Sequence, residues 1–201
     1  MSTDFSDFQQ HDPMRASIID AARELFAKFG YKKTTMEDIA MVLRKGKSSL
    51  YYYFKNKEDI FQAVLETEEG MLFSGLEKVV KSEAKPKDKF VQYVNVRMHT
   101  ILKLDNYIRT LRDEIYGGYE FIERLKSKSE ATESEFLLSI LKEGLNDGSF
   151  AVNNLNMAAT SIAIAIRGIE VPLLKASETE KDLQTNLDNI VGILFYGIVK
   201  R

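Results

Sequence analysis

The chain has 201 residues, of which 44% are hydrophobic and 29% are charged, and it contains no cysteine. This composition excludes disordered and fibrous proteins, and the absence of thiols excludes disulfides and thiolate metal sites. Although the net charge is only −2, residues 28–57 carry eight basic and two acidic side chains, a local +6 that leaves −8 for the rest. A basic segment beside an acidic remainder is typical of a DNA-binding module attached to a domain with another task, the alternative being an ordinary solvated surface.

In chain order, the first predicted elements are four helices. Asp12 and Pro13 supply an N-cap and a first-turn proline, so a helix is predicted from residue 13 to a terminating glycine, Gly30. The capping box of a second, short helix can form in two registers, Thr34 with Glu37 or Thr35 with Asp38. A third short helix is predicted over residues 47–54, and a fourth begins at residue 57.

The second part of the chain also reads as helical. A break at residues 81–87 is followed by one apolar stripe over residues 90–104, and further helices are predicted over about 107–116, 119–146, 154–174 and 180–200. No segment alternates as a strand would. Residues 158–174 are apolar but interrupted by polar side chains, so they predict a buried helix rather than a membrane span. The predicted fold class is all-α, with about nine helices.

Three short helices, two of them joined by a tight basic turn, suggest a helix-turn-helix unit. The third helix should carry polar groups on the face that enters a DNA major groove and apolar groups on the other face. Leu50 and Phe54 are four residues apart and predict the inner face. The three consecutive tyrosines at 51–53 cannot all face inward, because successive helical residues are about 100° apart. The alternative is a small bundle that buries its tyrosines.

Four segments, IIDAARELF (18–26), FGY (29–31), TTMEDIA (34–40) and SSLYYYFKNKE (48–58), resemble the N-terminal signature of the tetracycline-repressor (TetR) family of transcriptional regulators. The resemblance covers about residues 15–62 at the expected spacings; beyond them only length and helical layout are similar. It implies a helix-turn-helix DNA-binding domain at residues 1–62, of which 1–12 are a tail, and a ligand-binding and dimerisation domain at residues 63–201. It further implies a homodimeric repressor that binds a pseudo-palindromic operator and is released by a small-molecule inducer.

The resemblance also implies which residues contact DNA. They are Thr35, Arg44, Lys47, Ser48, Ser49, Tyr51, Tyr52, Tyr53 and Lys57. Thr35 would also cap the second helix, and Lys57 would clamp a phosphate. Arg44 stands where the family usually has glycine, and if the turn needs a positive φ, arginine there costs about 1 kcal/mol. Either the turn adopts another conformation or Arg44 is tolerated because it gains a phosphate contact; we expect tolerance.

The last two predicted helices carry wide apolar stripes and, in the first of them, many small residues. Small side chains let helices approach closely, as a four-helix dimer interface requires. The residues predicted for this interface are Ile162, Ile166, Leu187, Val191, Leu194, Phe195 and Ile198. The alternative is that both helices only form core.

An inducer pocket is expected among the helices spanning about residues 87–146 and 158–174. The predicted lining is Met98, Tyr116, Tyr119, Phe121 and Phe136, with Arg97, Arg109, Arg112 or Arg167 as a partner for an anionic group. Each of these could equally be core packing or a solvated charge. We expect a mainly apolar pocket that accepts an amphipathic or aromatic molecule whose identity the sequence does not give.

An enzyme is the main rival class. The chain has two histidines, His11 and His99, and no metal-spaced cluster, glycine-rich phosphate loop or nucleophile elbow, so neither catalysis, a cofactor nor a metal is expected. The acidic, polar N-terminus does not read as a signal peptide, and a cytoplasmic protein is expected. A DNA-binding regulator without a small-molecule ligand, whether an activator or gated by another protein, is the second alternative.

Overall fold

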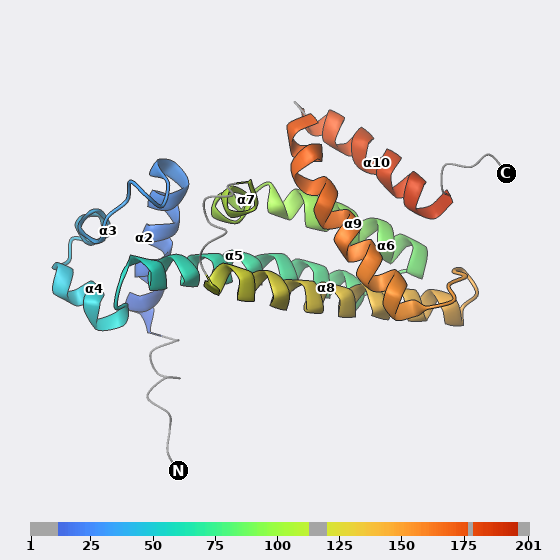
Figure 1. The fold of residues 1–201 in the computed structure, drawn as a ribbon, viewed down its shortest axis with the longest axis horizontal. Coiled ribbons are helices and arrows are strands. Elements are labelled where there is room, and N and C mark those ends of the chain that lie inside the picture. The colour runs from blue at the N-terminus through green and yellow to red at the C-terminus, as the bar shows by residue number, and fades with distance from the viewer. Residues whose placement is uncertain (1–11, 113–119, 177–178, 197–201) are drawn as a thin grey trace, which may run out of the picture. The chain divides into compact units, whose positions relative to one another are not determined.

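The computed structural model describes residues 12–112, 120–176 and 179–196, and every regular element within these ranges is an α-helix (Figure 1). The all-α class predicted from the sequence is therefore confirmed. The chain divides into two compact units: Met1–Glu69 with Asp105–Tyr107, and Gly70–Leu104 with Ile108–Arg201. The predicted domain boundary at residues 62 and 63 falls inside the continuous helix α5 (Lys57–Val80) and stays a prediction.

The first unit contains α2 (Pro13–Phe29), α3 (Met36–Val42), α4 (Lys47–Tyr53) and the first turns of α5 (Figure 1). Helix α2 begins where predicted, because the Asp12 carboxylate accepts a hydrogen bond from the Met14 amide at 2.7 Å. It ends at Gly30, whose φ of 84° is readily available only to glycine. The fully buried core of the unit includes Ile18, Phe26, Ile39, Leu50 and Ile60.

The start of α3 shows which capping register the chain uses. Thr35 is the N-cap: its hydroxyl oxygen accepts from the Asp38 amide at 3.2 Å, and the Asp38 carboxylate accepts from the Thr35 amide at 2.8 Å. These hydrogen bonds hold the pKa of Asp38 below its usual value. Thr34 is buried and donates its hydroxyl to the Gly30 carbonyl at 2.9 Å. Of the two predicted registers, the structure therefore has Thr35 with Asp38.

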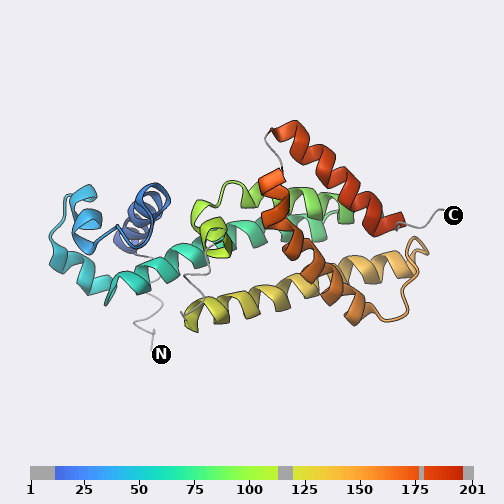
Figure 2. The ribbon, with the colours of Figure 1, turned by 45° about the horizontal axis from the view of Figure 1, so that its top comes forward.

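The second unit contains the rest of α5 with α6 (Pro86–Ile101), most of α7 (Asp105–Arg112), α8 (Glu120–Asn146), α9 (Leu155–Ala176) and α10 (Glu180–Tyr196). Helix α9 packs along α8, and α10 lies beside α6 (Figures 1 and 2). Tyr93, Met98, Leu137, Ile166 and Leu187 are fully buried between these helices. None of the described helices combines the length and apolar character that crossing a bilayer requires.

A charged cluster lies within this apolar core. Arg97 on α6 forms ion pairs with Glu133 on α8, at 2.8 Å, and with Glu170 on α9, and all three side chains are fully buried. Arg167 on α9 pairs with Glu133 at 3.1 Å and with the exposed Glu130 at 2.6 Å. Three helices that are distant in the sequence are thus joined by one network of charges.

Candidate nucleic-acid interface

The turn between α3 and α4 is closed by two backbone hydrogen bonds. The Lys45 amide donates to the Ala40 carbonyl and the Arg44 amide to the Met41 carbonyl, both at 3.0 Å. This is the Schellman pattern, in which the residue after the C-cap takes a left-handed conformation that usually selects glycine. Arg44 occupies that position with a φ of 53°. The turn therefore keeps its left-handed conformation with arginine in it; the phosphate contact of Arg44 stays a prediction.

Arg44→Gly is expected to raise the free energy of unfolding by about 0.5–1 kcal/mol, because glycine removes the left-handed penalty but loses more backbone entropy on folding. Urea denaturation measures the change. Arg44→Ala, which removes the side chain and keeps the penalty, is the control. A glycine variant that is no more stable than the alanine variant would contradict strain at this turn.

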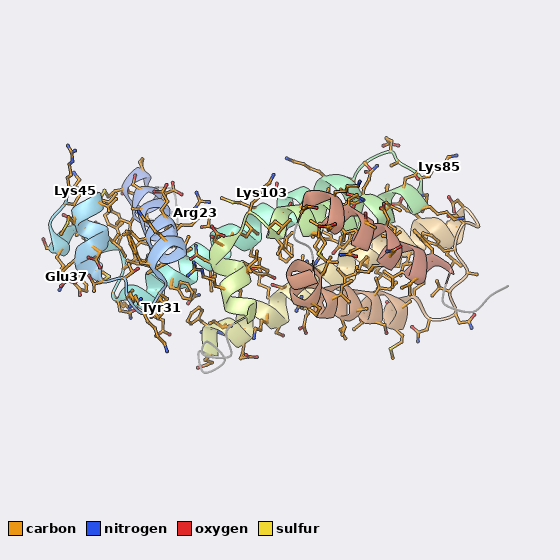
Figure 3. The ribbon with its side chains drawn as sticks, turned by 90° about the horizontal axis from the view of Figure 1, so that it is seen from above. Arg23, Tyr31, Glu37, Lys45, Lys85 and Lys103 are labelled. Carbon is orange, nitrogen blue, oxygen red and sulfur yellow. The ribbon has the colours of Figure 1, made fainter. Side chains whose placement is uncertain are left out.

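Helix α4 presents the polar outer face that a groove-binding helix needs. Leu50 and Phe54 are buried, as predicted, while Tyr51 and Tyr52 are 46% and 68% exposed. Lys47 and Ser48 are also exposed. A hollow of about 400 Å³ lies at the start of the helix, lined by Met14, Lys45, Ser48, Ser49, Tyr52 and Tyr53. Lys45 extends from the adjoining turn into solvent (Figure 3).

Two of the predicted DNA contacts are engaged at the surface by acidic partners. The ammonium of Lys47 pairs with the carboxylate of Glu37, which raises the pKa of Lys47 and lowers that of Glu37, mainly through their hydrogen bond. The hydroxyl of Thr35 is likewise bound to Asp38, at 2.7 Å. Because exposed ion pairs contribute little and are screened by salt, Lys47 can exchange Glu37 for a phosphate at small cost.

Tyr53 differs from its two neighbours. Its hydroxyl donates to the second oxygen of Asp12 at 3.1 Å, and desolvation raises the pKa of Tyr53. This bond joins the end of α4 to the residue that caps α2. The exposed aromatic groups of the helix are therefore Tyr51 and Tyr52. A DNA contact by Tyr53 stays a prediction, and in making it the Tyr53 hydroxyl would have to keep its hydrogen bond to Asp12 or exchange that bond for one to DNA.

Lys57 has an internal role that the sequence did not indicate. Its ammonium donates to the carbonyls of Tyr31 at 2.7 Å and Thr34 at 2.8 Å, and lies 4.3 Å from the centre of the Tyr31 ring. Desolvation lowers the pKa of Lys57. Two of its three donors thus tie the loop before α3 to the start of α5, and at most one is left for the predicted phosphate clamp.

The start of α7 is anchored inside the first unit, which the sequence also did not indicate. The Asn106 amide group donates to Glu68 at 2.8 Å and to the carbonyl of Arg23 at 3.1 Å, and the Tyr107 amide donates to the other Glu68 oxygen at 2.7 Å. Glu68 and Asn106 are almost fully buried, and burial raises the pKa of Glu68. The sequence showed only a break between helices at this point.

The residues predicted to bind an inducer do not gather around one described cavity. Met98 and Phe121 are buried, and Phe136 packs edge-on to Phe73 with ring centres 6.1 Å apart. Tyr116 and Tyr119 lie outside the described residues. The prediction that Arg97 or Arg167 holds an anion needs correction, because both guanidinium groups are already bound by glutamates.

Three of the predicted dimer residues are buried within their own chain. Ile166, Leu187 and Val191 are buried in the core of their own chain, so their side chains are not available to a partner. Ile162, Leu194 and Phe195 line a cavity within the chain, and Ile198 lies outside the described residues. The stripes are apolar faces, as predicted, but Ile166, Leu187 and Val191 belong to their inner side. A role in the dimer stays a prediction for the half-buried Ile162, Leu194 and Phe195. Among the side chains of α9 and α10 that the structure describes, the exposed large apolar ones are Met157 and Ile164 on α9 and Ile193 on α10.

Comparison with known proteins identifies the helix-turn-helix. Residues 18–64 match the family described as "Bacterial regulatory proteins, tetR family". The HTH-type transcriptional regulator QacR of Staphylococcus aureus is 28% identical over 162 residues, which are 78% of this chain and 84% of that protein. Residues 18–64 form a TetR-family DNA-binding domain. The chain is accordingly a DNA-binding transcriptional regulator and not an enzyme.

Solved structures support the TetR fold over nearly the whole chain. A transcriptional regulator from Cytophaga hutchinsonii is 28% identical with a TM-score of 0.75, over 92% of this chain and 97% of that chain. The regulator FadR of Bacillus subtilis, solved in complex with stearoyl-CoA, is 23% identical with a TM-score of 0.72, over 92% and 99% of the two chains. The second TetR domain, which the N-terminal signature does not cover, is therefore shared in fold as well.

Proposed function

We propose that this TetR regulator represses transcription by binding a pseudo-palindromic operator as a homodimer, and that a small molecule bound by the second unit releases it. The observation that carries the DNA-binding part is the outer face of α4, where the start of the helix offers Lys47 and Ser48 and the next turn offers Tyr51 and Tyr52. Amine, hydroxyl and flat aromatic groups of this kind bind phosphates and base edges. A dimer bound across a promoter would exclude the polymerase. We therefore propose that the regulator represses transcription rather than activating it. A protein that acts on chromosomal DNA is expected in the cytoplasm.

The exposed faces of α9 and α10 support the dimer. Ile164 is 61% exposed and Ile193 53%. Ala165 and Gly168 are exposed on the same side of α9 as Ile164, and nothing lies within 4 Å of a Cβ added at Gly168. Small and branched apolar side chains on adjoining helices suit a four-helix interface between two copies, since they allow close approach. A two-fold axis there would present two α4 helices to two half-sites.

The proposal that a small molecule releases the regulator is supported by a structural neighbour in this family. The structure of that neighbour, FadR, was solved with stearoyl-CoA bound. A regulator without a small-molecule ligand is the alternative. A rise in melting temperature with a candidate ligand, followed by loss of operator binding, favours the first; operator binding that no stabilising compound changes favours the second.

The DNA-binding proposal is tested by titrating the protein into fluorescent DNA from its own upstream region, at two salt concentrations, and following anisotropy. We expect salt-sensitive binding that scrambled DNA does not reproduce. Tyr51→Ala with Tyr52→Ala should weaken it by a factor of ten or more, since contacts to bases contribute about 1–3 kcal/mol each. Phe29→Ala is the matched control, because Phe29 is a similarly exposed aromatic residue, 51% exposed, on α2.

The control separates an effect of the α4 surface from a general effect of removing surface aromatics. If the tyrosine variant and Phe29→Ala bind genome-selected operator fragments as tightly as the wild type, α4 is not the DNA-contacting helix. If the protein prefers no fragment of its genome over scrambled DNA, the operator proposal itself fails.

A further inference from the structure

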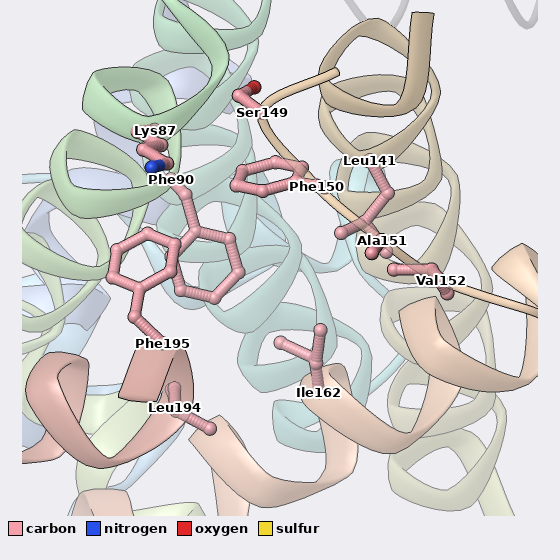
Figure 4. A pocket seen from close by; sticks show the side chains of 10 residues that line it. All are labelled: Lys87, Phe90, Leu141, Ser149, Phe150, Ala151, Val152, Ile162, Leu194 and Phe195. Carbon is pink, nitrogen blue, oxygen red and sulfur yellow. The ribbon is translucent and has the colours of Figure 1, made fainter. Parts of the chain in front are cut away.

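A cavity of about 380 Å³ lies in the second unit (Figure 4), and none of the described residues predicted for the inducer pocket lines it. This volume is within the range of about 300–1,000 Å³ that holds small ligands in proteins. Its apolar wall comes from four segments: α6, α8 with the loop that follows it, α9, and the end of α10. Figure 4 shows Phe90 and Phe195 side by side on one wall, Leu141 and Val152 on the opposite wall, and Ile162 between them.

Three aromatic rings form much of the apolar wall of the cavity. The rings of Phe90 and Phe195 have centres 5.0 Å apart, and those of Phe150 and Phe195 are stacked with an interplanar angle of 27° and centres 6.1 Å apart. Rings at these separations contact one another and form an aromatic wall, against which a further aromatic group can pack favourably. Since Phe90, Phe150 and Phe195 come from α6, the loop after α8 and α10, a ligand held by all three would bridge these segments.

Phe150 is fixed by a close approach to α8. A Cβ added at Gly144 would lie 2.0 Å from a carbon of the Phe150 ring, so the ring rests directly on the bare glycine. The Phe150 amide also donates to the Gly144 carbonyl at 2.8 Å, and Gly148 turns the chain with a φ of 77°. The loop is therefore built to hold the ring against the cavity.

Lys87 supplies the charged group at the rim (Figure 4). It is exposed and forms no ion pair with any residue that the structure describes. The neighbouring polar groups are already bound within the chain: Lys89 donates to Glu143 at 2.7 Å, and Asp147 accepts from the Ser149 amide at 2.9 Å. Hydrogen bonds from Ser149 are the main cause that lowers the pKa of Asp147, and Lys87 adds to this effect without forming a direct ion pair with Asp147. Among the residues that line the cavity, Lys87 is therefore a cation available to a ligand whose apolar body enters it.

We propose that this cavity is the effector site and that its ligand is an aromatic carboxylate, with the ring packed against Phe90, Phe150 and Phe195 and the carboxylate on the ammonium of Lys87. As an effector site it rests on the ligand-responsive function proposed above; as a binding site it does not. Neither Arg97 nor Arg167, whose guanidinium groups are bound by glutamates, lines the site.

Naphthoate, naphthamide and naphthylmethylammonium share one aromatic body and differ in charge, so they are suitable probes for the full-length protein. Saturating naphthoate is expected to raise the melting temperature by several degrees, and the amide and the ammonium compound far less. Lys87→Gln should weaken naphthoate about tenfold, because a charge-assisted hydrogen bond is lost. Lys85→Gln, an exposed lysine nearby that does not line the cavity, should leave the affinity unchanged.

Gly144→Ala gives a second, independent variant, since the added methyl group displaces Phe150 and should abolish naphthoate binding. The comparison of Lys87→Gln with Lys85→Gln keeps the proposal testable even if Gly144→Ala is unstable, because exposed lysines contribute little to folding. No stabilisation by any of the three probes, or equal binding of all three with no effect of Lys87→Gln, would overturn the proposal.

Adding operator DNA separates the two proposals. Naphthoate that binds and releases the operator supports both. Naphthoate that binds without releasing it keeps the aromatic-acid site and overturns its role as effector site. Specific operator binding by a protein that binds no naphthoate overturns the cavity proposal and leaves the DNA-binding function standing.

Discussion

Replacing Arg97 with methionine is expected to lower the free energy of unfolding by about 3–5 kcal/mol, enough to unfold many domains of this size. Arg97 is fully buried and is the ion-pair partner of two fully buried glutamates, Glu133 and Glu170. Methionine has a similar volume, so the loss comes from charge rather than from a cavity. Two carboxylates from different helices would be left facing each other with only Arg167 to neutralise Glu133.

Urea denaturation followed by circular dichroism measures this loss, with Arg124→Met as the control. Arg124 also pairs with a glutamate, Glu120, at 2.7 Å, but both side chains are largely exposed. Its replacement should cost about 0.5 kcal/mol or less. A loss for Arg97→Met no larger than that of the control would show that the network contributes nothing to the stability of the second unit.

Glu170 is expected to make stability fall as pH rises. Burial is the main cause that raises the pKa of Glu170, to about 7 from a usual value near 4.5, against the opposing effect of Arg97. Because the folded-state pKa lies above the unfolded one, the stabilisation is fully present below about pH 4.5 and is lost as pH rises through about 7. A displacement of this size corresponds to about 3 kcal/mol.

The measurement compares the wild type with Glu170→Gln from about pH 5 to pH 8. Glutamine does not titrate, so the difference in unfolding free energy between the two proteins should change with pH by up to about 3 kcal/mol, in the direction that favours the variant at high pH. Glu135→Gln, which removes an exposed carboxyl from α8, accounts for the general effect of one charge. A difference between wild type and Glu170→Gln that stays constant with pH would mean that Glu170 is ionised throughout this range.

The network also bears on which ligands the second unit can take. The sequence suggested that its buried arginines could hold an anion, but each arginine is opposed by two glutamates, so the cluster carries no spare positive charge. Lys87, by contrast, stands at a cavity and forms no direct ion pair with a described residue. Its acidic neighbour is Asp147, whose pKa is lowered mainly by hydrogen bonds from Ser149 and to a smaller extent by Lys87. An anionic ligand is therefore better accommodated at the rim than in the centre of the bundle.

The sequence by itself determined the features that depend on residues close together in the chain. Asp12 and Pro13 start α2, Gly30 ends it, and a capping box starts α3, because a cap acts over three or four residues; which of its two registers forms was decided by the structure. The spacing of Leu50 and Phe54 likewise set the inner face of α4. The resemblance left two conformations open for the turn at Arg44, and the structure shows the left-handed one.

Only the tertiary structure decided the features that join distant residues. The bond from Tyr53 to Asp12 spans 41 residues and that from Asn106 to Arg23 spans 83, and no local pattern marks either pair. An apolar stripe gives the amphipathic face of a helix but not which part of it meets its own core, so Leu187 was assigned to a partner and is buried instead. The cavity formed by Phe90, Phe150 and Phe195 depends on how α6, α10 and the loop after α8 pack, which is settled by the whole bundle and not by any one segment.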